Sequence, residues 1–156
     1  MSIDFDVSDL TRLGKTIEKL GKLPQKCVTK AARKGGNVVM KAVKQTAPVE
    51  TGLLKSGIRL KAEKTRTPGK KVYEVTFDAG MNDVFRKNIQ NPGAAGGDNK
   101  TAYYPASMEY GYFARNGRYI PGYHFMRNSA VGSEPEMSGV TLKVLADEVE
   151  KEWSKE

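Results

Sequence analysis

Few residues in this sequence have side chains suited to acid–base or nucleophilic chemistry. His124 is the only histidine and Cys27 the only cysteine among 156 residues. A zinc site needs several Cys or His ligands, and a Ser–His or Cys–His pair would have to use this one histidine. Glu109 lies between Met108 and Tyr110 in a stretch that we expect to be a strand. A carboxylate in such a place usually has a specific partner, for which we expect a Lys or Arg. No second carboxylate is near it in sequence to form an acid–base pair. We therefore predict no enzyme, no catalytic residues, no metal and no cofactor, and a hydrolase using His124 and Glu109 is disfavoured.

The charge of the chain is large and unevenly distributed. The net charge is +8, from 26 Lys and Arg against 18 Asp and Glu. Residues 1–71 hold 17 basic and 6 acidic residues, whereas residues 72–156 hold 9 and 12. Such asymmetry indicates attraction to nucleic acid or a membrane surface, or two sides that meet opposite charges in a partner. The longest apolar clusters are too short to span a membrane, and the length suits a single domain over residues 1–156.

Two amphipathic helices are predicted in the first third of the chain. The first has apolar residues three or four positions apart: Val7, Leu10, Leu13, Ile17 and Leu20. The second runs from Pro24 to Thr46 and stops before Pro48, because proline disfavours helical geometry in the preceding residue. Its apolar side carries Val28, Ala32, Gly35, Val39, Ala42, Val43 and Thr46. The pair Gly35-Gly36 predicts a bend or a close helix crossing. Cys27 lies at the rim of this side as a small buried residue.

Alternation of apolar and polar residues predicts strands further along. A hairpin is expected from strands near 58–62 and 72–77, joined by a turn at Thr67–Lys70. Residues 80–100 are rich in Gly and Asn and predict a long flexible loop, and residues 103–111 predict a strand. A short helix over 123–131 and a longer one over 135–153 follow. The apolar stripe of the longer helix is Leu142, Leu145, Ala146, Val149 and Trp153. The predicted fold is α+β, with an antiparallel sheet of about four strands packed against N-terminal and C-terminal helices.

The polar side of the second helix is basic. Its cations are Lys26, Lys30, Arg33, Lys34, Lys41 and Lys44, and no acidic residue lies between positions 22 and 49. Such a side can bind phosphates with salt-dependent affinity, or it can simply be solvated. Lysine predominates and aromatic residues are absent from it, which disfavours recognition of bases. Nucleic-acid binding is therefore the alternative function rather than the favoured one.

Three stretches follow one another in a pattern shared with a known family. They are APVETGLLKSGI at 47–58, YYPASMEYG at 103–111 and PGYHFMRNSA at 121–130, which leads into the C-terminal helix. In this order and context they resemble the tail-completion (head–tail joining) family of long-tailed bacteriophages, also described as minor tail or neck proteins. Two positions depart from the pattern. Tyr112 stands where the family usually has a small residue, and Ser129 where it often has proline.

The resemblance implies a non-enzymatic structural protein of a phage or prophage virion. Members are thought to form a ring, often hexameric, at the head-proximal end of the tail. The implied partners are further copies of the chain, the head–tail connector and the tail tube or tail terminator, and no membrane. The implied location is the tail or neck of the virion, with the bacterial host cytoplasm during assembly.

A ring needs two different patches that meet head to tail, and the uneven charge could supply them. We expect the basic second helix to approach the acidic C-terminal helix of the adjacent subunit. The predicted interface residues are Lys26, Lys30, Lys34, Lys41, Lys44, Glu109, Tyr110, Asp147, Glu148 and Glu150. Reversing Lys30, Lys34 and Lys41 to Glu should then impair assembly. Tyr110 and Phe125 are expected to be core or interface anchors. The loop over 80–100 should be mobile in the free monomer and ordered against a partner.

Overall fold

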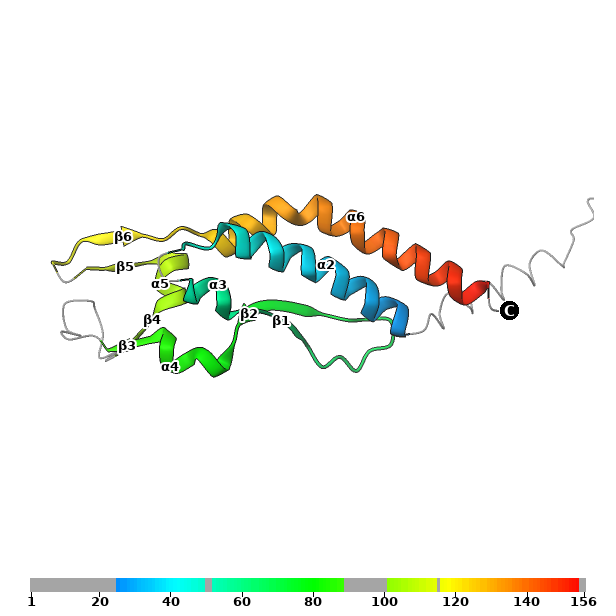
Figure 1. Cartoon of the computed structure of the whole chain (residues 1–156), viewed down its shortest axis with the longest axis horizontal. Coiled ribbons are helices and arrows are strands. Elements are labelled where there is room, and N and C mark those ends of the chain that lie inside the picture. Colours follow the sequence, from blue (N-terminus) through cyan, green and yellow to red (C-terminus); the bar gives the residue numbers. More distant parts are fainter. Residues whose placement is uncertain (1–24, 50–51, 89–100, 115, 155–156) are drawn as a thin grey trace, which may run out of the picture.

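The computed structural model describes residues 25–49, 52–88, 101–114 and 116–154, and its fold is α+β, as predicted. Two long helices, α2 (Gln25–Thr46) and α6 (Phe125–Trp153), lie side by side and antiparallel (Figure 1). The hairpin of β1 and β2 runs along α2. The shorter elements gather at the end of the molecule where α2 ends and α6 begins. The predicted helix over 7–20 lies outside the described residues.

Helix α2 has nearly the predicted bounds and ends two residues before Pro48. Its buried residues are Cys27, Ala31, Gly35 and Val43. They are spaced four or eight residues apart, which places them on one face. Cys27 is 1% exposed, so its predicted role as a small buried side chain is confirmed.

The glycine pair in α2 marks the close approach of three elements. A Cβ on Gly35 would overlap Thr141 Oγ1 on α6, and a Cβ on Gly36 would lie 2.9 Å from a methyl carbon of Leu60 in the hairpin. The first glycine therefore lets α6 approach α2, and the second lets the hairpin approach it from another side. Of the two predicted meanings of this pair, the close crossing is confirmed.

The C-terminal part of the chain forms one helix of 29 residues. The prediction of two helices separated before Pro135 was wrong. Proline lacks an N–H and costs a helix one internal hydrogen bond, but Pro135 lies on an exposed position of α6. The long contact with α2 stabilises the helix on both sides of it and outweighs this local cost.

Helix α6 buries one large apolar side chain at its start and polar side chains further along. Its buried residues are Phe125, Ser129, Ser133 and Glu148. The predicted apolar stripe is covered only in part: Leu145 and Val149 are half-buried, whereas Leu142 is 67% and Trp153 46% exposed. At the close crossing, Thr141 and Met137 of α6 lie directly against Gly35, so this side of α6 faces α2.

The predicted hairpin is confirmed. Strands β1 (Ile58–Ala62) and β2 (Tyr73–Phe77) pair antiparallel, with Ile58 opposite Phe77 and Ala62 opposite Tyr73. The turn between them is closed by a hydrogen bond that the backbone N–H of Lys70 donates to the carbonyl of Thr67, at 3.2 Å.

The remaining described elements are short. They are α3 (Leu53–Gly57), a 3₁₀ turn (Ala79–Met81), α4 (Asn82–Phe85), β3 (Arg86–Asn88), β4 (Thr101–Tyr103), α5 (Tyr104–Tyr110), β5 (Gly111–Phe113) and β6 (Tyr119–Pro121). Strand β3 pairs with β4 and β5 with β6, so the described strands form three separate two-stranded sheets and not one sheet of about four. Helical turns follow β2 and β4 directly and separate the three pairs.

Two local predictions need correction in this region. Residues 104–110 are helical, because Pro105 occupies the first turn of α5, where its missing N–H has no cost. Residues 80–88 are not a flexible loop: they form ordered elements around Phe85, which is 1% exposed. Residues 89–100 lie outside the described part of the chain.

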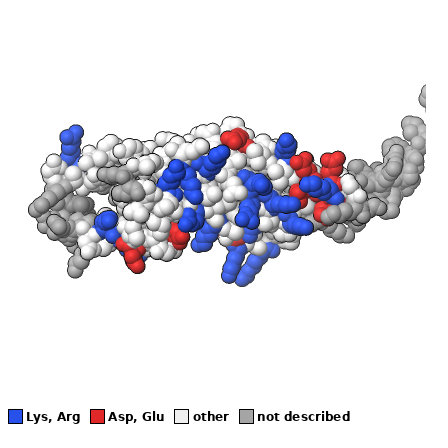
Figure 2. All heavy atoms as spheres, viewed as in Figure 1, with Lys and Arg blue, Asp and Glu red and all other residues white. Residues whose placement is uncertain are grey.

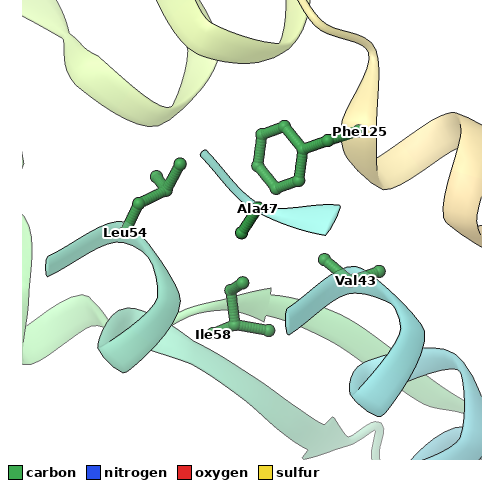
Figure 3. Close-up of a cluster of buried hydrophobic side chains, with 5 residues drawn as sticks. All are labelled: Val43, Ala47, Leu54, Ile58 and Phe125. Atoms are coloured by element: carbon green, nitrogen blue, oxygen red, sulfur yellow. The ribbon is translucent and has the colours of Figure 1, made fainter. Parts of the chain in front are cut away.

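The main core lies where α2 ends. Five buried side chains from four segments meet there (Figure 3): Val43, Ala47, Leu54, Ile58 and Phe125. Leu54 follows the turn at Gly52, whose φ of 71° is favourable only for glycine among the common residues. This cluster ties the end of α2, α3 and β1 to the beginning of α6.

Candidate functional site

The three stretches that carry the family resemblance meet around this core. Stretch 47–58 contributes Ala47 and Leu54, and stretch 121–130 contributes Phe125. Stretch 103–111 forms α5, from which Tyr104 and Met108 pack against the cluster. Phe125 is therefore confirmed as a core anchor. The shared pattern encodes the junction from which the two short hairpins, β3–β4 and β5–β6, extend (Figure 1).

The buried carboxylate of Glu109 holds the first turn of α6. Glu109 is 5% exposed, and its two carboxylate oxygens accept hydrogen bonds from the backbone N–H groups of Met126 at 2.9 Å and Arg127 at 3.1 Å. These N–H groups belong to the first turn of α6, so they have no partner within the helix. The preceding residue, His124, has a φ of 49° and provides no side-chain cap. Glu109 therefore acts as the cap from α5, and its charge faces the positive end of the helix dipole.

This arrangement corrects the expected role of Glu109. Its partners are backbone N–H groups in place of the expected Lys or Arg, and the ring of His124 is exposed. The carboxylate is committed to α6 and does not pair with the histidine side chain as a hydrolase would require. Burial inside the chain also leaves the Glu109 side chain little surface for direct contact with a partner.

Backbone contacts continue from this cap to the base of the β5–β6 hairpin. The N–H groups of Tyr123 and His124 donate to the carbonyls of Met108 and Glu109, at 2.8 and 3.0 Å. A Cβ on Gly122 would overlap the Glu109 carbonyl, so only glycine allows the two segments to pass this closely. The orientation of the hairpin is thereby fixed relative to α5 and α6.

We call residues 110–114 and 116–123 the aromatic arm, because they carry exposed aromatic side chains on a projecting hairpin. Tyr112 lies opposite Ile120 in the ladder, and Phe113 lies opposite Tyr119 with ring centroids 5.3 Å apart. The exposed fractions are 68% for Tyr110, 65% for Tyr123, 55% for Phe113, 49% for Tyr119, 46% for Tyr112 and 38% for Ile120. Isolated two-stranded hairpins are marginally stable, and apolar patches of this kind mark interaction surfaces.

The β3–β4 hairpin is attached more firmly to the body. Phe85 lies between Phe77 and Tyr103, with edge-to-face ring contacts at 5.7 and 5.9 Å. Burial raises the pKa of the Tyr103 phenol, and the nearby Arg86 guanidinium opposes this only in part. Strand β3 is exposed and β4 is mostly half-buried, so this hairpin presents the side chains of β3 to solvent.

Charged residues separate along the molecule (Figure 2). Lys and Arg side chains spread over α2 and the β1–β2 hairpin, and a group of Asp and Glu lies where α2 begins and α6 ends. At that end Lys30 Nζ lies 2.8 Å from a Glu148 carboxylate oxygen, and Lys151 Nζ lies 3.3 Å from the other. The hydrogen bond from Lys30 holds the pKa of Glu148 below its usual value, against the opposing effect of burial.

The predicted interface residues fall into three places. Five of them line a shallow pocket at the junction of α2 and α6 within one chain: Lys26, Lys30, Asp147, Glu148 and Glu150. Lys34 and Lys41 are exposed in the middle of α2, and Lys44 is half-buried near its end. Glu109 and Tyr110 lie at the far end, at the base of the aromatic arm. The expected pairing of α2 with an acidic C-terminal helix thus occurs inside the chain for Lys30 and Glu148. A contact of Lys34 and Lys41 with another subunit remains a prediction.

The described residues contain no group of three or more His, Cys, Asp or Glu side chains placed to hold a metal ion. In the same part of the chain, no helix combines the length and the apolar character needed to cross a membrane.

Sequence reasoning missed the aromatic arm and the exposed side of α6. A signal for the arm was present, since six large aromatic residues fall within positions 110–125 around Gly117. Reading residues 103–111 as a single strand hid the hairpin, because it placed these side chains on a sheet with a covered face.

Residues 11–111, more than half of the chain, match the family model described as "Bacteriophage HK97-gp10, putative tail-component". No curated protein and no solved structure matches the chain.

Proposed function

The chain belongs to the HK97-gp10-like family of phage tail components, and from this membership we propose that it completes the tail and joins it to the head connector as a ring. As a member of this family it is a non-enzymatic structural protein located in the virion tail. In this proposal the chain lies at the head-proximal end of the tail. The tail tube or tail terminator is on one side of it and the connector is on the other. Six copies are the proposed number, as the resemblance to tail-completion proteins implies.

The aromatic arm is the observation that carries this proposal. Side chains such as Tyr110 and Phe113 are more than half exposed, on a hairpin with few contacts of its own to stabilise it. Burial against a neighbour removes this apolar surface from water and stabilises the hairpin at the same time. Aromatic residues on a rigidly oriented base are typical anchors of protein–protein interfaces.

A row of exposed apolar side chains on α6 of the same chain supports a head-to-tail contact. Val131, Leu142 and Trp153 are 65%, 67% and 46% exposed and recur every eleven residues on α6. Eleven residues are about three helical turns, so the three side chains share one side of the helix. We propose that the arm of one copy packs on this outer side of α6 in the next copy. Two different patches that recognise each other generate a closed ring when the rotation between copies closes.

The test is assembly of purified chain with arm variants. Phe113→Ser combined with Tyr119→Ser removes an exposed ring pair, while Val49→Ser removes a 70% exposed side chain outside the arm. We expect the arm variant to lose rings in electron microscopy and to remain monomeric by light scattering, whereas V49S assembles as the unmodified chain does. The same comparison applies to incorporation into tails. Ring formation by the arm variant at the unmodified level would contradict the proposal.

Nucleic-acid binding is the alternative function, and the exposed cations of α2 and the hairpin favour it (Figure 2). Lys34 and Lys41 lie on one side of α2, 11 Å apart along its axis by the ~1.5 Å rise per residue. Binding through such contacts would show a steep decrease in DNA affinity with salt, and Lys34→Glu with Lys41→Glu would reduce that slope. Steep salt-dependent DNA binding without affinity for tails would favour this alternative over the joining role.

A further inference from the structure

An apolar groove of about 590 Å³ runs along α2 between β2 and α6. Its floor is the side of α2 that carries Ala32 and Val39, and its walls include Val75 of β2 and Met137 of α6. None of the described residues that line it belongs to β1, so β2 is the strand of the hairpin that borders the groove. Lys71 is the single charged residue among the described side chains of the lining. An apolar surface of this kind in contact with water is unfavourable and indicates a place where a partner binds.

The hydrogen-bond ladder of the hairpin decides which backbone groups of β2 point toward the groove. Along an antiparallel pair, every second residue of a strand bonds to the partner strand, and the residues between them point their N–H and C=O groups the other way. The N–H of Asp78 donates to the carbonyl of Gly57 at 2.8 Å, and the N–H of Glu63 donates to the carbonyl of Val72 at 3.0 Å. In this register the even-numbered positions from 72 to 78 are those that bond toward β1.

The odd-numbered residues of β2 therefore turn their N–H and C=O groups to the edge away from β1. Tyr73 and Val75 are such residues, and their half-buried side chains line the groove. In the described part of the chain β2 pairs only with β1, so these backbone groups have no strand partner there. Unpaired N–H and C=O groups at a sheet edge are a template for another strand. The edge and the groove together suit an extended segment that pairs with β2 and inserts alternate side chains into the groove.

The length of the groove suits a strand of about five residues. The groove-lining residues of α2, from Ala32 to Val43, extend about 16 Å at ~1.5 Å per residue. A strand of about five residues has the same length at ~3.3 Å per residue. Because successive side chains of a strand point to opposite sides, every second side chain of the segment enters the groove. These side chains must be apolar to match the lining, whereas the others face solvent and can be polar.

One end of the groove is positively charged. Lys71 lines both the groove and a neighbouring pocket of about 340 Å³, which also contains Arg66, Thr65 and Thr67. Among the described residues, no carboxylate lies within ion-pair distance of Lys71 or Arg66. The ammonium of Lys71 donates instead to the backbone carbonyl of Glu63, at 2.8 Å. Carboxylates on the bound segment would therefore complement this end of the groove.

We propose that β2 accepts a third strand from a partner protein: an extended segment with apolar residues at alternate positions and carboxylates at the end beside Lys71. Antiparallel pairing is the more stable arrangement. Because β2 runs from the Lys71 end of the groove toward Val75, antiparallel pairing places the acidic residues at the C-terminal end of the segment. The inference does not depend on the ring, since neither the aromatic arm nor the exposed apolar row of α6 lines the groove.

Fluorescence anisotropy of a labelled peptide with the whole chain tests the charged end of the groove. The probe is the synthetic peptide VTVTVDD with the dye at its N-terminus, which has valine at alternate positions and two carboxylates at its C-terminal end. Lys71→Gln and Lys70→Gln remove the same charge from neighbouring positions, but Lys70 does not line the groove. We expect K71Q to weaken binding of the probe about threefold more than K70Q does. Failure of the unmodified chain to bind the probe, or equal effects of the two variants, would overturn the proposal.

A pair of variants on α6 checks that the probe lies in this groove. Ala130 lines it and is exposed, so Ala130→Asp introduces a charge into the groove without disturbing the core. Val131→Asp makes the same change at an exposed position outside the groove. We expect A130D to weaken binding of the probe about tenfold and V131D to leave it nearly unchanged. An equal loss in both variants would show that the probe responds only to net charge and would contradict the assignment.

Residue-resolved hydrogen exchange tests the strand pairing itself. In the chain alone, the amide hydrogens of Tyr73 and Val75 should exchange faster than those of Glu74 and Thr76, which bond to β1. Saturation with the probe should slow exchange at Tyr73 and Val75 about tenfold, because their N–H groups then bond to the added strand. Unchanged exchange at these two positions with bound probe would exclude pairing with β2.

Exchange in the chain without the probe identifies other occupants of the edge. Slow exchange at Tyr73 and Val75 that becomes fast on dilution of the protein would show that a second copy covers β2. Slow exchange that persists on dilution would show that the same chain covers it. Either result would overturn the assignment of this edge to a partner protein, whereas fast exchange at both concentrations supports it.

Discussion

At the residue scale, Glu109 links the family pattern to the orientation of the aromatic arm. Its carboxylate caps α6, and its own carbonyl accepts the N–H of His124 at the base of the arm. The side chain and the backbone of one residue therefore fix where α6 starts and where the arm leaves the body. A carboxylate suits this position because it accepts two N–H groups at once and carries a charge that favours a helix N-terminus.

Glu109→Gln should lower the free energy of unfolding by about 1–2 kcal/mol, because the amide loses the charge and one of the two acceptors. Glu134→Gln makes the same chemical change at an exposed position of α6 and should change it by less than about 0.5 kcal/mol. Chemical denaturation of the three proteins measures the difference. Equal stability of the two variants would show that the cap is not used.

The ion pair of Glu148 predicts a dependence of stability on acid pH. The hydrogen bond from Lys30 lowers the pKa of Glu148 in the folded chain, so the folded state binds the proton less readily than the unfolded state. The contribution is present above the ordinary pKa of Glu, about 4.3, and is lost as the pH falls through the lowered pKa. The stability difference between the unmodified chain and Glu148→Gln should therefore shrink between neutral pH and about pH 3.

Urea denaturation at a series of pH values measures this difference. Glu150→Gln is the control, since Glu150 is an exposed carboxylate on the same turn of α6. A difference between the unmodified chain and E148Q that stays constant over the whole range would contradict the pairing with Lys30.

At the element scale, the separation of α2 and α6 is set by Gly35. The crossing leaves Thr141 directly against Gly35, and a hydroxyl pair joins Thr46 to Ser129 near the end of the helix pair where α2 ends and α6 begins. Close approach at a glycine gives many backbone and side-chain contacts between the two helices. Leu142 and Trp153 of α6 are left on its outer side, where another subunit can reach them.

Gly35→Ala should destabilise the chain by about 1–3 kcal/mol, although alanine is the better helix former, because its methyl group overlaps Thr141 Oγ1. Removing that oxygen with Thr141→Ala in the same chain should recover most of the loss. Gly139→Ala on α6 is the matched control: its Cβ would meet nothing within 4 Å, so it should be neutral or stabilising. A double-mutant cycle of thermal denaturation measures the coupling. Destabilisation by G35A that T141A does not relieve would contradict the close crossing.

At the scale of the whole molecule, the two ends carry different surfaces. One end presents the aromatic arm and the exposed strand β3, and the other presents the acidic end of α6 beside Lys26 and Lys30. An elongated molecule with unlike ends is suited to contacts with unlike neighbours on its two sides. This polarity is what the proposed position between tail and connector requires.

The proposed contact of the basic helix α2 with another subunit is best tested at Lys34 and Lys41, because Lys30 already forms an ion pair with Glu148 of its own chain. Lys34→Glu with Lys41→Glu should weaken ring assembly about tenfold if α2 meets an acidic neighbouring surface, and the loss should diminish at high salt. Lys61→Glu with Lys64→Glu changes the net charge equally on the hairpin and should assemble normally. Light scattering over a range of concentrations measures both. Equal assembly by the two double variants would exclude this helix from the contact.

Local patterns in the sequence determined much of the fold. The spacing of apolar residues and the flanking prolines predicted α2, and strict alternation around Thr67–Lys70 predicted the β1–β2 hairpin. These elements are long enough for one periodic face to be read from the residues alone. The three motif stretches likewise indicated the family that the match over residues 11–111 shows.

Tertiary structure decided what local patterns could not. Local patterns predicted a helix break before Pro135, but contact with α2 keeps α6 continuous. They also predicted a strand over 103–111, where Pro105 instead occupies the first turn of a helix. Which side of α6 is covered depends on how closely Gly35 lets two helices approach, a distance that no local pattern encodes. The partner of Glu109 is supplied by residues 17 and 18 positions further along the chain. Only folding brings those N–H groups to the carboxylate, because a hydrogen bond depends on position in space and the sequence fixes only order along the chain.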